Sequence, residues 1–336
     1  MFLSKFKKRG TNDLKDISSY GLSYNWSGAV DQAARKLEFS IAYNTKDKGF
    51  SNITISDGDT VYLYYVDDEA PSATPYEIFR GDVISVNRNT SNFTMEFVAF
   101  DKLLLLAKNK ATRKFTNITV EAVIEQVCNE FGIGIGNICP IGMYVNFIAD
   151  NQSGTEMIKK AFYYAYAQNN LQYHMYMRED KLYVIERNEC VENYTASNYL
   201  NIEHTQHSAS IENMVNTVVI VNKAGEEIGR VSNDADLNVY GKRQAVYKEN
   251  KKKNTQLAAQ AMLKTVEFKS SLSGLGNIQC ISGYSIAVQE EQLKGRFNIK
   301  SDKHSITDNV HKMDLELEYY GIVSNEEDIS GDVGGK

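Results

Sequence analysis

The sequence of 336 residues lacks the features that would indicate a membrane, secreted or disordered protein. Only three prolines occur and no tract is low in complexity, so a long disordered linker is not expected. No window approaches the roughly 18 uninterrupted apolar residues of a membrane span. The first ten residues are basic but carry no apolar run of the kind found in signal peptides. We therefore expect a compact chain that folds in the cytoplasm and does not insert into a membrane by itself.

The sequence also has few cysteines and no excess of positive charge. Cys128, Cys139, Cys190 and Cys280 show no paired metal-ligand spacing, so buried thiols are favoured over disulfides or a metal site. The formal net charge of -6 argues against a general nucleic-acid binder, which needs a dominant basic face. The basic clusters within residues 5–9 and 242–253 lack interleaved aromatic residues, and we expect them to form solvated loops or polar subunit contacts.

What the sequence does contain, over its first hundred residues, is alternation of apolar and polar residues. The segments 37–43, 61–65 and 95–99 alternate with the period of half-buried strands. A further strand is predicted over 78–86, with Gly81 inside it. Glycine within a strand indicates a bulge or sharp bend where a side chain would not fit.

From about residue 110 the period becomes helical. A helix is predicted to start at Thr119, which can cap it, and to end at Gly132 in a left-handed conformation. A second helix fits residues 155–169. Two strands at 171–177 and 181–187, joined by the polar turn Arg-Glu-Asp, predict a hairpin. This middle region therefore resembles a small α+β unit.

The last third returns to β-structure. Strands are predicted at 217–222 and 245–248, one helix is predicted at 255–266, and the final strand places Met313, Leu315, Leu317 and Tyr319 on its core face. Earlier in the chain, a short apolar helix, KLLLLAK at 102–108, is predicted after the strand that closes at Asp101. After Gly321 the chain has no apolar period, so disorder is expected. A faint internal echo relates the segments around Gly81 and Gly283.

Histidines are the first candidates for chemistry. His204 and His207 have metal-like spacing, with His174 as a conceivable third ligand. Because their surroundings predict loop or strand, surface histidines are favoured, and metal binding stays open. His304 and His311 are predicted in a polar loop before the last strand, where each would make a turn or interface hydrogen bond.

Other patterns that resemble cofactor-binding or catalytic motifs have simpler structural explanations. The glycine-rich segment 131–137 follows a helix and opens none, which favours a helix-ending turn over a dinucleotide loop. The acidic pairs at 67–68 and 290–291 are adjacent residues that point apart on strands or loops. No nucleophile, acid-base pair or metal cluster is evident. We predict no catalytic, cofactor-binding or metal-binding residue.

Tyrosine is unusually frequent, with 21 residues against a single tryptophan, Trp26. The clusters could form a sugar-binding surface, but they lie on alternating strands throughout the chain. Tyrosine is enriched at protein interfaces, where its ring packs and its hydroxyl finds a partner. We therefore favour protein contacts, with Trp26 as a packing anchor of the first β-rich region.

The order of these motifs resembles a known family. The tripeptide Trp-Ser-Gly at 26–28, the segments IFRGDV, AFDKLLLL and FTNITVEAVIEQVCNEFGI, and later SIENMVNTVVIV, GNIQCISGYSIAV and GRFNIKSDKHSI occur in one succession. This succession resembles the baseplate hub proteins of contractile phage tails and phage-tail-like bacteriocins, the XkdQ/YqbQ-like tail hub family. The individual motifs are short and non-catalytic, so the resemblance depends on their order over nearly the whole chain.

The resemblance implies an α+β, mainly β fold with two tube-forming β-barrel domains at 1–109 and 204–322, an inserted small α+β domain at 110–203 and a disordered tail at 323–336. It implies a homotrimeric ring, assembled in the bacterial host cytoplasm, that adapts a sixfold tail tube to a threefold spike. The partners would be tube, spike and other baseplate proteins, with DNA only as cargo through the channel. No enzyme activity or cofactor is implied. The alternatives are a hub-associated peptidoglycan hydrolase and a cell-wall carbohydrate-binding tail protein, and infectious phage and bacteriocin both stay open.

Overall fold

The computed structural model describes residues 1–67, 74–89, 91–250, 255–291 and 293–321. The described chain forms two compact units, which are considered separately: unit 1 contains residues 1–205 and 271–321, and unit 2 contains residues 206–270. The fold is α+β and mainly β, as expected. Among the described residues no sheet closes into a barrel, so the two-barrel plan is not seen within one chain. The tail at 323–336 lies outside the described residues.

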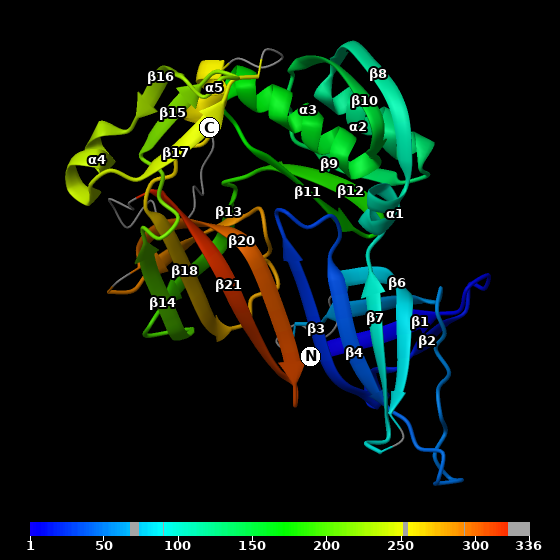
Figure 1. The fold of residues 1–336 in the computed structure, drawn as a ribbon. Coiled ribbons are helices and arrows are strands. Elements are labelled where there is room, and N and C mark those ends of the chain that lie inside the picture. The colour runs from blue at the N-terminus through cyan, green and yellow to red at the C-terminus, as the bar shows by residue number, and fades with distance from the viewer. Residues whose placement is uncertain (68–73, 90, 251–254, 292, 322–336) are drawn as a thin grey trace, which may run out of the picture. The chain divides into compact units, whose positions relative to one another are not determined.

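The first β-rich region of unit 1 consists of seven strands (Figure 1). They are β1 (Phe2–Lys7), β2 (Leu14–Asp16), β3 (Gly21–Ala29), β4 (Lys36–Ala42), β5 (Thr60–Tyr65), β6 (Tyr76–Asn89) and β7 (Thr94–Phe100), with the 3-10 turn η1 (Ser18–Tyr20). They pair in the order β3-β4-β7-β6-β5-β1-β2. The four predicted strands are confirmed as β4, β5, β6 and β7. Their inward residues form one core with Trp26, which confirms that residue as a packing anchor.

Gly81 in β6 marks a close approach between backbones. A Cβ atom added there would lie 2.3 Å from the carbonyl oxygen of Phe100. Register irregularities fall on both sides of it, opposite Leu63/Tyr64 and at Val83/Ser85. The prediction that no side chain fits at this position is confirmed.

The middle region follows α1 (Leu103–Lys108), which the apolar run had predicted. It contains β8 (Lys110–Thr119), α2 (Val120–Glu130), β9 (Gly134–Ile138), β10 (Tyr144–Ser153), α3 (Gly154–Asn169), β11 (Tyr173–Arg178) and β12 (Lys181–Glu186). Both predicted helices and the hairpin are confirmed. The Thr119 side chain accepts the N–H of Ala122, and Gly132 has φ +68°. β9 was missed, because its glycine-rich segment was interpreted only as a turn.

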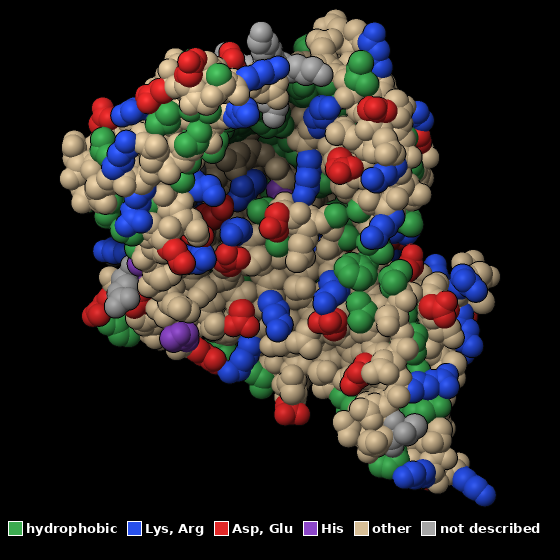
Figure 2. Space-filling model, in the orientation of Figure 1, with side chains coloured by type: hydrophobic (Ala, Val, Ile, Leu, Met, Phe, Trp, Pro, Cys, Tyr) green, Lys and Arg blue, Asp and Glu red, His purple; other side chains and the backbone are tan. Residues whose placement is uncertain are grey.

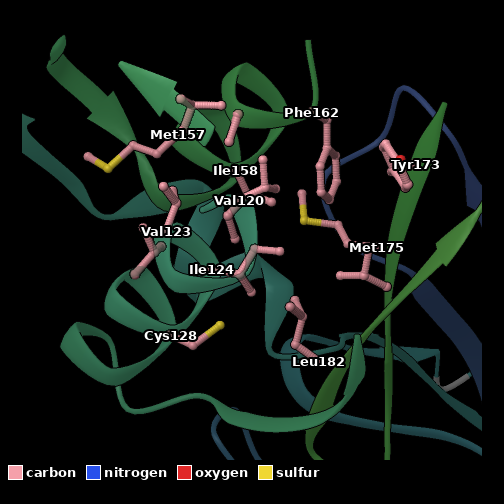
Figure 3. Packing of buried hydrophobic residues seen from close by; sticks show 14 of the residues in the cluster. Val120, Val123, Ile124, Cys128, Met157, Ile158, Phe162, Tyr173, Met175 and Leu182 are labelled. Atoms are coloured by element: carbon pink, nitrogen blue, oxygen red, sulfur yellow. The ribbon is translucent and has the colours of Figure 1, made fainter. Parts of the chain in front are cut away.

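The core of the middle region lies between α2, α3 and the hairpin (Figure 3). Val123, Ile124 and Cys128 of α2 face Met157, Ile158 and Phe162 of α3, while Met175 and Leu182 close the core from β11 and β12. The Glu179-Asp180 turn has positive φ at both residues, the geometry of a tight two-residue hairpin. This region is therefore a folded layer with its own hydrophobic core.

The second β-rich region comprises β13 (Cys190–Ser197), β14 (Ile202–Ser210), β18 (Glu267–Leu275), β19 (Ser285–Gln289), β20 (Lys294–Thr307) and β21 (Val310–Gly321). Strands β14 and β18 continue into unit 2. The predicted last strand is confirmed as β21, with Met313, Leu315 and Leu317 at most 3% exposed. Tyr319 is 54% exposed, so its assignment to the core face was wrong. It lies beyond the buried stretch and packs its ring edge-on to Phe297.

Unit 2 contains β15 (Thr217–Val221), β16 (Glu227–Ser232), α4 (Asp234–Tyr240), β17 (Gln244–Lys248) and α5 (Thr255–Gln260). β15 pairs antiparallel with β16 and parallel with β17, and α5 covers a small core that includes Val218, Ile220 and Ala259. Within the predicted second barrel domain, residues 206–270 thus form a compact unit of their own. The predicted helix at 255–266 ends earlier, at Gln260. No helix in the described ranges is long and apolar enough to cross a bilayer.

Candidate functional site at the branch of β20

Strand β20 joins the two β-rich regions of unit 1, because one of its edges is shared between two partners. Residues Lys294 to Asn298 pair with β19, and Ser301 to Thr307 pair with β3. Between these stretches the Ile299 N–H donates to Tyr284 O, and the Val30 N–H donates to Lys300 O. The other edge of β20 pairs with β21 from Arg296 to Thr307. Residues 299–302 therefore form the branch of β20 (Figure 1).

A buried ion pair lies at this branch. Arg35, next to β4, donates from Nη1 to Asp302 Oδ1 at 2.9 Å and also pairs with Oδ2. The Ser282 N–H donates to the same Oδ1 at 2.7 Å. Asp302 is 2% exposed and Arg35 8%. Three segments that are far apart in sequence thus meet at one carboxylate.

Gly28 explains how the guanidinium fits. It pairs with Asp302 across β3 and β20, and a Cβ atom at this position would lie 2.3 Å from Arg35 Nη1. The third residue of the Trp-Ser-Gly tripeptide must therefore be small, because the side chain of Arg35, seven positions later, occupies the space where a Cβ atom would lie. Its flanking tryptophan belongs to the same site.

Each charge of the ion pair stabilises the ionised form of the other group. Burial alone would raise the pKa of Asp302, but the charge of Arg35, with hydrogen bonds from His304 and Arg35, holds the pKa of that carboxyl well below its usual range. Burial opposes the charge of Arg35, and Asp302 outweighs this and raises the pKa of the guanidinium. Both groups are therefore ionised in the folded protein, where each depends on the other.

His304 is not in a polar loop, so that prediction was wrong. It lies inside β20 with 0% exposure, and its ring stacks on Trp26 with centroids 4.7 Å apart and 4° between planes. His304 Nε2 is 3.1 Å from the Cys280 carbonyl, which can only accept, so this nitrogen carries a proton. The other ring nitrogen, Nδ1, is 3.1 Å from Nε2 of His311. Sequence alternation failed here because the aromatic stack and three polar partners satisfy the imidazole.

His311, the first residue after Val310 in β21, is partly buried beside the same stack. Burial and the neighbouring His304 lower the pKa of His311 to about 3. Its ring also lies 5.0 Å from that of Trp26, centroid to centroid. His304 and His311 thus form a hydrogen bond with each other within one subunit, and His311 also lines a cavity of about 440 Å³.

Asp101 is a second buried acid near Arg35. Its Oδ2 accepts the backbone N–H of Arg35 at 3.2 Å, and its Oδ1 accepts that of Leu103 at 3.0 Å, at the start of α1. Burial raises the pKa of Asp101 to about 7, since these hydrogen bonds and the charge of Arg35 only partly offset desolvation. Asp101 therefore links the site to the beginning of the middle region.

Because the Asp101 carboxyl is held in its protonated form by burial, we expect the free energy of unfolding to fall as pH rises from about 4 to about 7. The folded carboxyl keeps its proton up to about pH 7, whereas an unfolded aspartate loses it near pH 4, so the contribution is full below about pH 4 and is lost above. At about 1.4 kcal/mol per pKa unit, the effect is at most about 4 kcal/mol. Denaturant unfolding at pH 5 and pH 8 measures it. The variant Asp101→Asn should flatten this difference, and the exposed control Asp47→Asn should leave it unchanged; a slope unaltered by Asp101→Asn would contradict the assignment.

The three histidines considered for a metal site lie in different surroundings. His204 and His207 lie three positions apart on β14 and so point to opposite faces. His207 Nδ1 is 2.9 Å from the hydroxyl of Ser270, and its ring stacks on Phe268. His174 is buried in β11, where desolvation and nearby cations lower its pKa to about 3. Within the described ranges, no group of three or more His, Cys, Asp or Glu could hold a metal ion.

The four cysteines are free thiols, two buried and two partly buried. Of the acidic pairs, residue 68 lies outside the described residues, and Glu290 accepts from the backbone N–H of Leu293. Gly81 lies within a strand, whereas Gly283 has φ +97° just before β19, so the two glycines of the echo differ in local geometry. The prediction that the protein has no site residues stays a prediction.

The tyrosines divide between core and surface. Tyr24, Tyr62, Tyr173, Tyr176 and Tyr194 are buried. Those that are more than a third exposed are Tyr144, Tyr163, Tyr166, Tyr199, Tyr240 and Tyr319. Figure 2 shows positive and negative side chains interspersed on the visible face, without a continuous basic patch. The prediction of protein contacts therefore applies to the exposed group alone.

Comparison with known proteins places these features in a wider group. A family model described as YQBQ-like matches residues 24–318. YqbQ of Bacillus subtilis is 27% identical and the phage-like element PBSX protein XkdQ of the same organism is 25% identical, each over 308 residues that cover 88% of this chain and 91% of the relative.

Solved structures share the fold. The 43 kDa tail protein of prophage MuSo2 from Shewanella oneidensis has a TM-score of 0.66 at 12% identity, covering 94% of this chain and 98% of that one. An Escherichia coli component of the type VI secretion system, described as similar to the T4 phage tail proteins gp27 and gp5, has a TM-score of 0.53 at 9% identity, covering 94% of this chain and 77% of that one.

Proposed function

The chain belongs to the YQBQ-like family, and from this premise we propose that it is the hub of a contractile-tail baseplate, a trimeric ring that adapts a sixfold tail tube to a threefold spike. The observation that carries the proposal is the family match over residues 24–318, which covers β4 to β20, most of β3 and β21, and everything between them, but not β1 and β2. The relative XkdQ is a protein of a phage-like element. The structural neighbours are described as tail proteins and a type VI secretion component.

The branch of β20 supports this role physically. A conduit needs walls that keep their shape, and Arg35, Asp302 and the Trp26-His304 stack fix two β-rich regions to one strand. Two similar β domains per chain would give a trimer six equivalent positions under a sixfold tube, a change of symmetry that a ring with one domain per chain cannot make. In this proposal the duplicated domains at 1–109 and 204–322 complete their barrels only in the ring, where neighbouring subunits cover exposed strand edges.

The rest of the domain plan follows. The middle region, residues 110–203, would lie outside the tube wall, where its own core makes it independent of the ring. The partners would be the tube protein, the spike and other baseplate proteins, and assembly would take place in the bacterial host cytoplasm. DNA would pass only through the channel. We propose no chemistry for this chain, and release of soluble muropeptides from purified peptidoglycan by the wild-type protein would contradict that.

We expect the purified protein to sediment as a trimer, because its ring interfaces are made by the protein's own β-rich regions. Sedimentation velocity from about 1 to 100 µM, with negative-stain imaging of the same sample, measures the mass and shows whether a channel is present. A protein that stays monomeric over this range, alone and with spike or tube protein added, would contradict the ring. Glu316 of β21, whose side chain is 43% exposed, provides a variant for the proposed interface.

A further inference from the structure

We propose that the acidic segment 322–336 of this chain binds in cis to a cationic, aromatic cavity beside the end of β21. The cavity measures about 310 Å³ and lies wholly within unit 1. Its floor is formed by Phe162, Tyr173 and Met175, each at most 8% exposed. This inference does not depend on the ring.

The rim of the cavity is aromatic and open. Tyr163 and Tyr166 on α3 line it, with exposures of 68% and 41%. Large aromatic side chains at the mouth of a hollow are typical of surfaces that bind another segment of protein, since they offer apolar area at low entropic cost and a hydroxyl for hydrogen bonding. The cavity therefore suits a peptide with both apolar and polar groups.

Two cations give the cavity its charge. Lys159 donates only to the carbonyl oxygens of Val30 and Asp31, at 3.4 and 3.2 Å, and makes no ion pair within the described parts of the chain. Desolvation lowers the pKa of Lys159. Arg187 has a buried Nε without a hydrogen-bond partner among the described residues. An anion in the cavity would pair with Lys159 and add to the contacts that the Arg187 guanidinium already makes with Gln172 and Glu318.

His174 also lines the cavity, and the charges of the same cations act on its ring. After desolvation, the causes that lower its pKa are the positive charges of Arg35, Arg187 and Lys159. Like charges destabilise a protonated imidazole, and Asp302 only partly opposes them, so His174 is neutral. A neutral histidine adds no charge of its own, which leaves Lys159 and Arg187 as the cations that line the cavity.

The occupant is identified by where the chain leaves β21. Arg187 Nη2 donates to Glu318 Oε2 at 2.7 Å, and Gly321, the last residue of the strand, pairs with Arg296. The guanidinium of Arg296 in turn donates to the carbonyl of Asn188, next to Arg187. The chain therefore leaves the strand beside the cavity.

The composition of the following segment matches the cavity. Residues 322–336 read IVSNEEDISGDVGGK, in which Glu326, Glu327 and Asp328 form a run of acids flanked by Ile322 and Ile329. Five extended residues span about 17 Å, which sets the maximum reach of the first acid, Glu326, from Gly321 at the end of β21. A tethered ligand has an effective concentration in the millimolar range, which allows modest contacts to keep the cavity filled.

The test uses a labelled peptide of residues 322–336 and full-length protein. We expect the wild-type chain to leave the peptide unbound in fluorescence anisotropy, because its own segment fills the cavity. A full-length variant with Glu326→Gln, Glu327→Gln and Asp328→Asn should bind the peptide, since its own segment has lost the charges that hold it. Adding Lys159→Gln or Arg187→Gln to that variant should weaken binding at least about tenfold, the effect expected for one charge-assisted hydrogen bond.

Lys160→Gln is the matched control. Its ammonium donates to Ile148 O and lies over the ring of Phe147, away from the cavity, so peptide binding should be unchanged. Circular dichroism of each variant verifies the fold. Equal binding to wild type and to the acid-neutralised chain, binding to neither, or binding that is insensitive to Lys159→Gln and Arg187→Gln would each overturn the proposal. Oligomers that dissociate in Arg187→Gln would instead identify a second copy as the occupant and overturn it as well.

Discussion

Replacing Asp302 by Ala should destabilise the protein by about 3 to 5 kcal/mol, the cost of leaving one member of a buried ion pair without its partner. Arg35 would keep its charge in a site where it is 8% exposed, and the Ser282 N–H would lose its acceptor. The effect should be measured as the free energy of unfolding from denaturant titration at pH 7. A loss below about 1 kcal/mol would show that water reaches the guanidinium and that the pair is not buried in solution.

The surface pair next to it provides a matched control. Lys36 and Glu38 form an ion pair on β4 with side chains 34% and 47% exposed. Because solvent screens such pairs, Glu38→Ala should cost less than about 1 kcal/mol. The double variant Arg35→Met/Asp302→Leu should lose much less stability than the two single changes together, since no charge is then left buried. Additive losses would mean that Arg35 and Asp302 act independently.

Sequence patterns predicted the local elements of this fold well where one periodicity dominates. The alternation in β4 and β7 and the helical period of α2, with Thr119 as its cap, are properties of neighbouring residues, so a short window contains the signal. Tyr319 shows the limit, because alternation alone does not indicate where a strand leaves its core. β9 was missed for the related reason that glycine weakens a strand pattern.

The branch of β20 could not be predicted in the same way. Arg35 and Asp302 are 267 positions apart, and each looks like an ordinary polar residue within its own segment. A buried charge is recognised only through its partner, and the partner is set by tertiary pairing of β3 with β20. The available signal was the Trp-Ser-Gly tripeptide: Gly28 is small because Arg35 needs the space, and Trp26 stacks on His304. Without the fold, that tripeptide indicated only a packing anchor.

Substitutions on the two faces of β21 should have different effects, one on folding and the other on assembly. Leu317 is 3% exposed in the core of the second β-rich region, whereas Glu316 on the opposite face has a side chain 43% exposed and pairs with Lys300 at 2.9 Å. A ring interface would use the second face and leave the first untouched. The two residues therefore offer substitutions of comparable chemistry with different expected outcomes.

Replacing Leu317 by Asp should unfold the second β-rich region, at a cost above about 5 kcal/mol. Loss of the buried leucine alone is worth roughly 2 to 5 kcal/mol, and the carboxylate would be buried among Ile299, Met313 and Leu315 without a partner. Replacing Glu316 by Lys should cost about 1 kcal/mol, since it exchanges an exposed ion pair for repulsion with Lys300. Circular dichroism should then separate the two variants, and light scattering should show that Glu316→Lys weakens the proposed trimer while Glu316→Gln retains it. A cooperative unfolding transition of Leu317→Asp close to that of the wild type would place β21 outside the core, whereas unfolding of both variants would remove the distinction between a core face and a contact face on which the proposed ring depends.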